Sequence, residues 1–351
     1  MTSRELVCAA LRFEGPARVP MSLPEPYPHD FCWGGPGPDP EHPGTGWEEV
    51  GPDRWQRTDE WGNTWARAEG FSKGEVARGA VEDWDQLDEI ELPDYDLPER
   101  YEGARARYDE NPEKFHIGGL PGFPFNVARK IRRLDNFLLD VLAEPDRAAR
   151  LLEMVEQQLH HGIRRLAEAG GDCIMFPEDW GTQDRLLVRP DVWRRMFRPG
   201  FDRLCRTARE CGVHVFMHSC GFIHEVMDDL VEAGIDLFQF DQPRIYGIRR
   251  LADEFGDRVT FWCPVDIQHT LQTRDPEAIE RDAREMIELL GAGGGGFIAG
   301  YYGGNEAIGL DPKWQDIACR AFVRYGAPEV WAELKDKLEP NPALQQQGET
   351  P

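Results

Sequence analysis

Beyond residue 112 the chain alternates between short apolar runs and longer segments with helical periodicity. The clearest helical segment is 146–169, where apolar residues recur at i, i+3 and i+4 on one face. Apolar runs typical of strands begin near residues 115, 173, 213, 235, 258 and 294. Between and after these runs we predict helices over 146–169, 191–211, 223–233, 248–255, 276–290 and 314–325.

The predicted strands are apolar along their length, as in parallel sheets covered on both faces. Repeated βα units of this kind form either a closed barrel or an open doubly wound sheet. Polar residues lie at the carboxyl ends of several strands, and in a barrel these ends share one mouth. No GxGxxG run follows an early strand, which argues against a dinucleotide-binding sheet. We therefore predict the α/β class, a (β/α)8 TIM barrel with an N-terminal loop-rich extension.

The N-terminal third has a different composition, because it is rich in Pro, Gly, Trp and acidic residues. We predict that 1–110 is an extension packed on the barrel, with an early strand at 18–23. Within it, 53–68 is predicted to be a hairpin that turns at Gly62 and Asn63. Residues 111–335 would form the main part of the barrel and 336–351 a flexible tail.

The negative net charge of the chain limits the kinds of molecule that we expect it to bind. Acidic residues number 64 and Lys plus Arg 40, a formal net charge of −24. This field repels nucleic acid and anionic membrane surfaces, although a local Arg cluster still allows an anionic small molecule. No apolar run is long enough to cross a membrane, the first residues do not resemble a signal peptide, and eight cysteines are scattered without a framework. We therefore expect a reduced, cytoplasmic protein with a small-molecule substrate.

The sharpest chemical motif is His218-Ser219-Cys220-Gly221. Alternate residues on a strand face one side, so His218 and Cys220 can point together into the mouth and form half of a zinc site. Asp241 and Cys263 end the next two strands and would complete the metal ligands. The alternatives are ordinary strand-end residues at His218 and Cys220, a solvated acid or an acceptor of substrate hydrogen bonds at Asp241, and a buried, inert thiol at Cys263.

A second polar cluster follows the strand that begins near residue 173. Glu178 and Asp179 are adjacent, so they point to opposite sides and one faces the mouth. We predict that Asp179 takes part in catalysis and that Glu178 contacts substrate or neighbours the metal; a helix cap with a surface acid is the alternative. Gln183 would orient a polar group of the substrate.

Further candidates come from the last two strand ends. Asp266 and Gln268 are predicted to bind substrate, although Asp266 can also cap a turn. The Gly-rich run 291–296 predicts a tight turn, and Gly303-Gly304 predicts a loop that allows close approach of a ligand. Tyr301 would then supply an aromatic wall to the substrate, and Tyr302, like Asp179 and His218, a catalytic group.

Four motifs together resemble a known family: EDWGTQ (178–183), a Pro-x-x-Trp-Arg helix (190–194), HSCG (218–221) and VDIQ (265–268). The chain resembles the uroporphyrinogen decarboxylase superfamily, and most closely its corrinoid-dependent methyltransferase branch. The resemblance implies a (β/α)8 barrel with its site at the mouth, and a homodimer. The arginine-rich run with which the decarboxylase holds porphyrinogen is replaced by MSLPEPYPHDF (21–31), which argues against that substrate.

In the methyltransferase branch a His-x-Cys pair and a later cysteine bind zinc and activate a thiol. His218 and Cys220 match the pair. Near the last strand this chain has Ala299-Gly300-Tyr301-Tyr302, so Cys263 is the substitute for the later cysteine. Cobalamin-independent methionine synthase has a similar His-x-Cys pair and uses an acidic ligand on the next strand. Asp241 would suit that role.

The resemblance implies a methyltransferase that moves a methyl group between a small methylated substrate and a corrinoid or thiol acceptor at a zinc site. The chain has no D-x-H-x-x-G run for binding a corrinoid, so a partner protein would supply it. A metal-independent decarboxylase or lyase acting on a small carboxylate is the second hypothesis. A non-catalytic ligand-binding barrel is the third.

Overall fold

A computed structural model describes residues 1–68 and 73–345 of the chain. In these residues seven strands form one parallel sheet in the order β1-β6-β7-β8-β9-β10-β11. The strands are β1 (Phe31–Gly34), β6 (Phe115–Gly119), β7 (Cys173–Pro177), β8 (His214–His218), β9 (Leu237–Gln239), β10 (Thr260–Cys263) and β11 (Phe297–Ala299).

The sheet is curled, and it is not a closed ring of eight strands. Met21 forms an isolated parallel bridge with Ala299, and the Asp30 N–H donates to the Met21 carbonyl at 2.9 Å. The predicted strand at 18–23 thus contributes a bridge between the two edges, while the first strand of the sheet is β1. Pro20 and Pro24 flank the bridge, and proline has no N–H to donate to a ladder. The α/β class and the curled parallel sheet are confirmed; the closed eight-stranded barrel is not.

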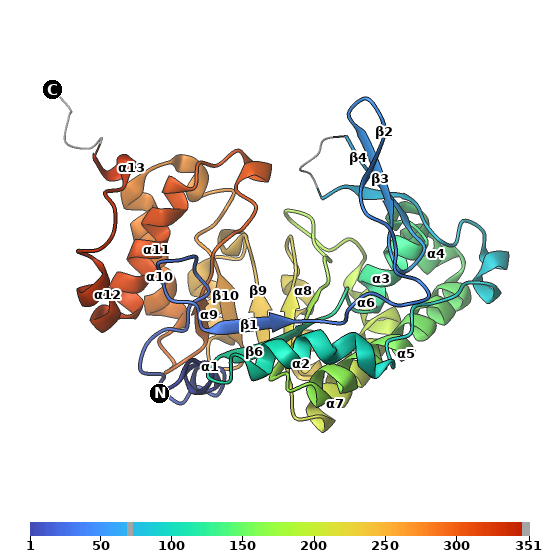
Figure 1. Ribbon diagram of the computed structural model, residues 1–351, viewed down its shortest axis with the longest axis horizontal. Helices are drawn as coiled ribbons and strands as arrows, with labels where there is room; N and C mark the ends of the chain where they lie inside the picture. The colour runs from blue at the N-terminus through green and yellow to red at the C-terminus, as the bar shows by residue number, and fades with distance from the viewer. Residues whose placement is uncertain (69–72, 346–351) are drawn as a thin grey trace.

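Helices follow the strands and cover the outer face of the sheet (Figure 1). The single helix predicted over 191–211 is two helices, because Pro199 lies in the first turn of the second, where its missing N–H costs nothing. The helices are α1 (Ser3–Leu11), α2 (Glu102–Asp109), α3 (Pro124–Ile131), α4 (Leu134–Ala143), α5 (Pro145–Glu168), α6 (Pro190–Met196), α7 (Arg198–Glu210), α8 (His224–Ala233), α9 (Ile248–Phe255), α10 (Pro276–Leu290), α11 (Lys313–Gly326), α12 (Pro328–Leu334) and α13 (Pro342–Gln345). Short 3-10 turns lie at Trp84–Asp88, Pro98–Tyr101, Pro243–Ile245, Leu271–Thr273 and Glu306–Ile308.

The two-residue period of the strands separates an inner core from an outer one. On β8, Phe216 packs in the inner core, whereas Val215 and Met217 pack in the outer core against the helices. Val7 and Leu11 of α1 join the inner core, so α1 closes the amino end of the curled sheet. The opposite, carboxyl end is the open one, which we call the mouth.

An antiparallel sheet in the N-terminal region consists of β2 (Glu48–Gly51), β3 (Arg54–Thr58), β4 (Thr64–Arg67) and β5 (Glu75–Arg78). The predicted hairpin is confirmed as β3–β4, with Gly62 at φ 80° and Asp59 accepting the Asn63 N–H. Figure 1 shows this sheet beside α3 and α4, on the opposite side of the molecule from α10–α13. The predicted flexible tail, 336–351, contains the helix α13, whose Ala343 is buried. Residues 346–351 lie outside the described residues.

No helix in the described part of the chain has the length and apolar content needed to cross a membrane.

Candidate functional site

The mouth contains two adjoining cavities in the described structure, with volumes of about 420 and 180 Å³. Both are lined by Asp241 and Tyr302, so together they form one recess. The floor of the larger cavity is aromatic, with Trp262 stacked on Phe216 at 5.1 Å between ring centroids. Such a floor keeps water away from one side of a bound small molecule.

Three potential metal ligands meet at the edge of this recess, where one of them, Cys220, lines the smaller cavity. Atoms of Asp179, His218 and Cys220 all lie within 4.8 Å of one another, the one such group among the described residues. The Cys220 Sγ lies 3.4 Å from His218 Nε2, and His218 Nε2 lies 3.6 Å from Asp179 Oδ1. The His-x-Cys pair therefore does share one side, and an acid from the preceding strand end joins it.

Close backbone packing brings the two motifs together. Gly221 has φ 74°, and a Cβ there would lie 2.1 Å from the Gly181 carbonyl oxygen. The Phe222 N–H donates to the Thr182 carbonyl at 2.7 Å. Glycine at both 181 and 221 is what allows the loop after β8 to lie directly on the loop after β7.

Asp179 is held on both of its oxygens. Its Oδ1 accepts the Cys220 backbone N–H at 2.9 Å, and its Oδ2 pairs with Arg129 Nη2 at 3.5 Å. Arg129 is itself fixed, since its Nε donates to Asn126 Oδ1 at 2.7 Å. The carboxylate is thereby oriented before any ligand binds.

Gln239 fixes the tautomer of His218. Its Nε2 donates to Asp241 Oδ1 at 2.7 Å, and a carboxylate requires a donor there. The Gln239 Oε1 must then face His218 Nδ1, with which it is in hydrogen-bond contact. Nδ1 therefore carries the proton, and the Nε2 lone pair points toward Cys220 and Asp179. Parallel pairing of β8 with β9 places Gln239 directly opposite His218.

The surroundings of Cys220 disfavour a free thiolate. Desolvation within the mouth, followed by the nearby carboxylates of Asp179 and Asp241, raises the pKa of Cys220 to about 12. The thiol is therefore protonated at neutral pH in the protein alone. A dication would reverse this balance, because it favours thiolate and carboxylate ligands.

Asp241 and Cys263, the other predicted metal ligands, lie in different places. Asp241 lines the recess but joins the cluster through Gln239 rather than directly. Cys263 follows the inward-facing Trp262, so the strand period turns it to the outer core, where it is fully buried. Burial raises its pKa, and its thiol has no place in the mouth. The structure thus does not bring Cys263 to the predicted ligand set.

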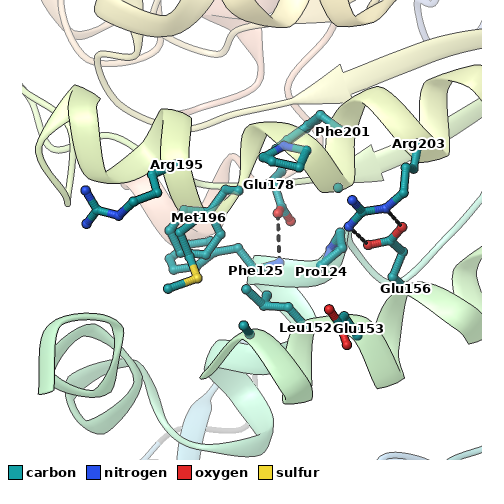
Figure 2. A pocket seen from close by; sticks show the side chains of 14 residues that line it. Pro124, Phe125, Leu152, Glu153, Glu156, Glu178, Arg195, Met196, Phe201 and Arg203 are labelled. Atoms are coloured by element: carbon teal, nitrogen blue, oxygen red, sulfur yellow. Dashed lines mark hydrogen bonds and ion pairs between the residues drawn. The ribbon is translucent and has the colours of Figure 1, made fainter. Parts of the chain in front are cut away.

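Glu178 faces away from the mouth. It is fully buried, and its carboxylate accepts backbone N–H groups from Phe123, Phe125 and Asn126 at 3.0–3.1 Å. Figure 2 shows it directed at the start of α3, in a cavity of about 190 Å³ between helices where Glu156 pairs with Arg203. Burial raises the pKa of Glu178 to about 8, against the lowering effect of the three donors. The position of Glu178 agrees with the alternative that it caps a helix, and it does not place Glu178 in contact with a substrate in the mouth.

Asp266 is likewise occupied by the backbone. It is fully buried, and it accepts N–H groups of Arg244, Gln268 and His269 at 2.7–3.0 Å. Asp266 therefore stabilises the loop after β10, in agreement with the alternative that it caps a turn. Gln268 lines the smaller cavity, and Gln183 is exposed, where its Nε2 donates to Gln242 Oε1 at 3.0 Å.

The two tyrosines lie on the remaining wall. Tyr302 lines both cavities, and its backbone N–H donates to Gln315 Oε1 at 3.0 Å. Tyr301 lines the larger cavity, with its hydroxyl accepting from Asn305 Nδ2 at 2.8 Å.

Sequence reasoning missed Arg129, Gln239 and Lys73. Strand alternation could have found Gln239, because it precedes Asp241 by two residues and so shares its side of the sheet. No sequence signal joins Arg129 on α3 to Asp179. Lys73 lines the larger cavity from the loop before β5 of the antiparallel sheet, which was not predicted beyond its β3–β4 hairpin.

Comparisons with known proteins agree with this architecture. The methylated-thiol–coenzyme M methyltransferase of Methanosarcina mazei is 24% identical over 183 residues, 52% of this chain and 47% of that protein. The uroporphyrinogen decarboxylase of Thermus thermophilus is 26% identical over 178 residues, 48% of this chain and 50% of that protein. The chain thus spans about half the length of the curated relatives it matches.

A solved methyltransferase from Methanosarcina mazei shares the fold, with a TM-score of 0.57 and 18% identity over 74% of this chain and 73% of that one. The family model described as uroporphyrinogen decarboxylase (URO-D) matches residues 71–302, which is well over half of the chain and contains every residue of the Asp179, His218 and Cys220 cluster. The chain therefore belongs to the uroporphyrinogen decarboxylase family.

Proposed function

We propose that the protein is a methyltransferase that moves a methyl group between a small methylated substrate and a corrinoid or thiol acceptor at a zinc site in the mouth. The observation that carries this proposal is the convergence of Asp179, His218 and Cys220 within 4.8 Å beside an aromatic-floored recess. The family includes a relative named as a methylated-thiol–coenzyme M methyltransferase, which supports methyl transfer as the reaction class.

The donor set suits zinc. Carboxylate, imidazole and thiolate are all ligands that zinc accepts, and three protein ligands with an open position are typical of catalytic zinc. His218 presents Nε2 because Gln239 takes the proton on Nδ1. Zinc bound here would supply the Lewis acidity that keeps a substrate thiol deprotonated near neutral pH. Asp241, one hydrogen bond behind His218, would tune that ligand rather than bind the metal.

The remaining groups either hold Asp179 in place or contact the substrate. Arg129 and the Cys220 N–H hold Asp179 in place, so that its carboxylate does not rotate away when a ligand enters. Trp262 and Phe216 exclude water from beneath the methyl group, and Tyr302 offers its phenol between the two cavities. Tyr301, Gln183 and Gln268 would contact the less reactive part of the substrate. A partner protein would carry the corrinoid.

Metal content tests the site. Elemental analysis of tag-free protein should find about one zinc per chain in the wild type and none in Cys220→Ala. Cys263→Ala is the matched control, because it removes a thiol that lies in the outer core, and it should keep its zinc. Equal zinc in wild type and Cys220→Ala, or loss of zinc in Cys263→Ala alone, would contradict the proposed ligands.

Activity tests the reaction. Purified protein should transfer methyl groups from methylated thiols or amines to free cob(I)alamin, measured by the absorbance change of the cobalamin. Zinc-free wild type and Cys220→Ala should both lose this activity. Zinc-loaded protein that transfers methyl groups no faster than buffer would remove the proposal.

A metal-independent decarboxylase or lyase is the second candidate, because the family includes decarboxylases and Arg129 places a cation beside Asp179. This hypothesis expects Cys220→Ser to keep its activity on small carboxylates and Asp179→Asn to lose it. The methyltransferase proposal expects both variants to be impaired.

A further inference from the structure

A cavity outside the mouth carries an unusual concentration of positive charge. It has a volume of about 620 Å³ and lies between strands β4 and β5 on one side and helices α3 and α4 on the other. Arg129, Lys130 and Arg133 line it, in a chain whose net charge is −24. We call this cavity the basic cleft.

The acidic residues of the basic cleft do not neutralise its centre. Asp135 is exposed and pairs with Arg133, and Glu75 lies exposed at the edge. The Lys130 ammonium has no carboxylate oxygen within 4.0 Å anywhere in residues 1–68 and 73–345. Its neighbours are the Pro121 carbonyl at 3.3 Å and the Trp65 ring, 5.8 Å from centroid to Nζ.

Burial without an ionic partner makes the charged form of this lysine less stable than that of an exposed lysine. Desolvation, followed by the charge of Arg129, lowers the pKa of Lys130 to about 8. Arg129 is paired with Asp179, whereas Lys130 has the Pro121 carbonyl as its one hydrogen-bond partner among the described residues, so its ammonium keeps unsatisfied donor capacity. An anion in the cleft would supply the counter-charge that Lys130 lacks.

Arg129 connects the basic cleft to the mouth. It lines the cleft, and its guanidinium pairs with Asp179 at 3.5 Å. Its other hydrogen bond, from Nε to Asn126, leaves Nη1 without a partner among the described residues.

We propose that the basic cleft binds the anionic group of a small molecule, a carboxylate, sulfonate or phosphate, held by the Lys130 ammonium and the Arg129 guanidinium with the Trp65 ring as a wall. Arginine provides a planar fork for two oxygens and lysine a point charge, a combination suited to such groups. The inference rests on the charge and contacts of the cleft, so it does not depend on zinc or methyl transfer at the mouth.

Isothermal titration of the full chain in low-salt buffer at pH 7 tests this, with inorganic phosphate, sulfate and succinate as probes. We expect at least one probe to bind the wild type, and Lys130→Met to weaken it at least tenfold. Lys130→Arg should keep most of the affinity. Lys335→Met removes the same charge at an exposed site on the far helical layer and should bind as the wild type does.

The probes also distinguish the source of the ligand. Tighter binding of phosphate or sulfate indicates a tetrahedral anion, whereas tighter binding of succinate indicates the carboxylate of an organic acid. If no probe binds the wild type, or if Lys130→Met and Lys335→Met bind equally, the inference is wrong.

A measurement on the wild type guards against a variant that fails to fold. Acetic anhydride labelling followed by mass spectrometry should show Lys130 protected by the probe that binds best, while Lys335 labels equally with and without it. Equal labelling of Lys130 under both conditions would overturn the inference.

Discussion

Replacing Gln239 by Leu should weaken zinc binding without touching a proposed ligand. The substitution keeps a similar volume but removes the acceptor for His218 Nδ1 and the 2.7 Å donor to Asp241. The His218 imidazole can then carry its proton on either nitrogen, and its ring is free to rotate. Loss of such a supporting partner typically reduces metal affinity about 10–100-fold, which corresponds to about 1.4–2.7 kcal/mol.

The assay is competition between the protein and a chromophoric zinc chelator at pH 7, with circular dichroism to confirm that each variant folds. Gln239→Glu keeps an acceptor for Nδ1 but replaces the donor to Asp241 by a second carboxylate oxygen, so it should bind zinc more tightly than Gln239→Leu and no more tightly than the wild type. Gln242→Leu is the matched control, an amide of the same recess that contacts Gln183 instead of His218. The reasoning is refuted if Gln239→Leu binds zinc within about twofold of the wild type, since its expected loss is at least tenfold.

Three further outcomes follow from the same structure. Glu178→Gln leaves the Phe125 N–H facing an amide NH2 in place of a carboxylate oxygen, so in urea melts at pH 9, above the raised pKa of Glu178, it should lower the free energy of unfolding by about 1–3 kcal/mol; an unchanged midpoint at that pH would contradict the capping role. Because the pKa of Lys130 is lowered to about 8, the unfolded chain binds more protons between pH 8 and about 10.5, so wild-type stability should rise relative to Lys130→Met over that window, by up to about 3 kcal/mol; parallel stability curves would argue against the lowered pKa. Tyr302→Phe should reduce the methyl-transfer rate about 10-fold or more while zinc content stays unchanged, and equal rates would remove the phenol from the mechanism.

The helical layer and most strands could be predicted from sequence because burial on one face imposes a simple period. Residues 146–169 show this best, since their apolar stripe matches the buried face of α5. The β1 strand was missed because it is four residues long and lies among Pro-rich loops. Its neighbours in the sheet, not its own pattern, determine where it forms.

Within the site, the sequence could predict which residues share a strand face but not how loops turn at its end. His218 and Cys220 lie together because two-residue spacing is a local property. Glu178 and Asp266 were predicted to contact substrate, yet Glu178 accepts backbone N–H groups from residues 123–126, and Asp266 accepts from Arg244 as well as from its own turn. The donors at 123–126 and at Arg244 come from distant parts of the chain, so no local pattern predicts them.

The docking of α1 at the amino end of the curled sheet has a consequence for biosynthesis. The Gly296 N–H donates to the Ala10 carbonyl at 3.0 Å, and the Gly15 N–H to the Gly294 carbonyl at 2.6 Å. Since α1 lies far ahead of these partners in the chain, Val7 and Leu11 cannot complete their packing until the ribosome has delivered the segment around residue 296. Chaperones that recognise apolar stretches on nascent chains would therefore have a long opportunity at this helix.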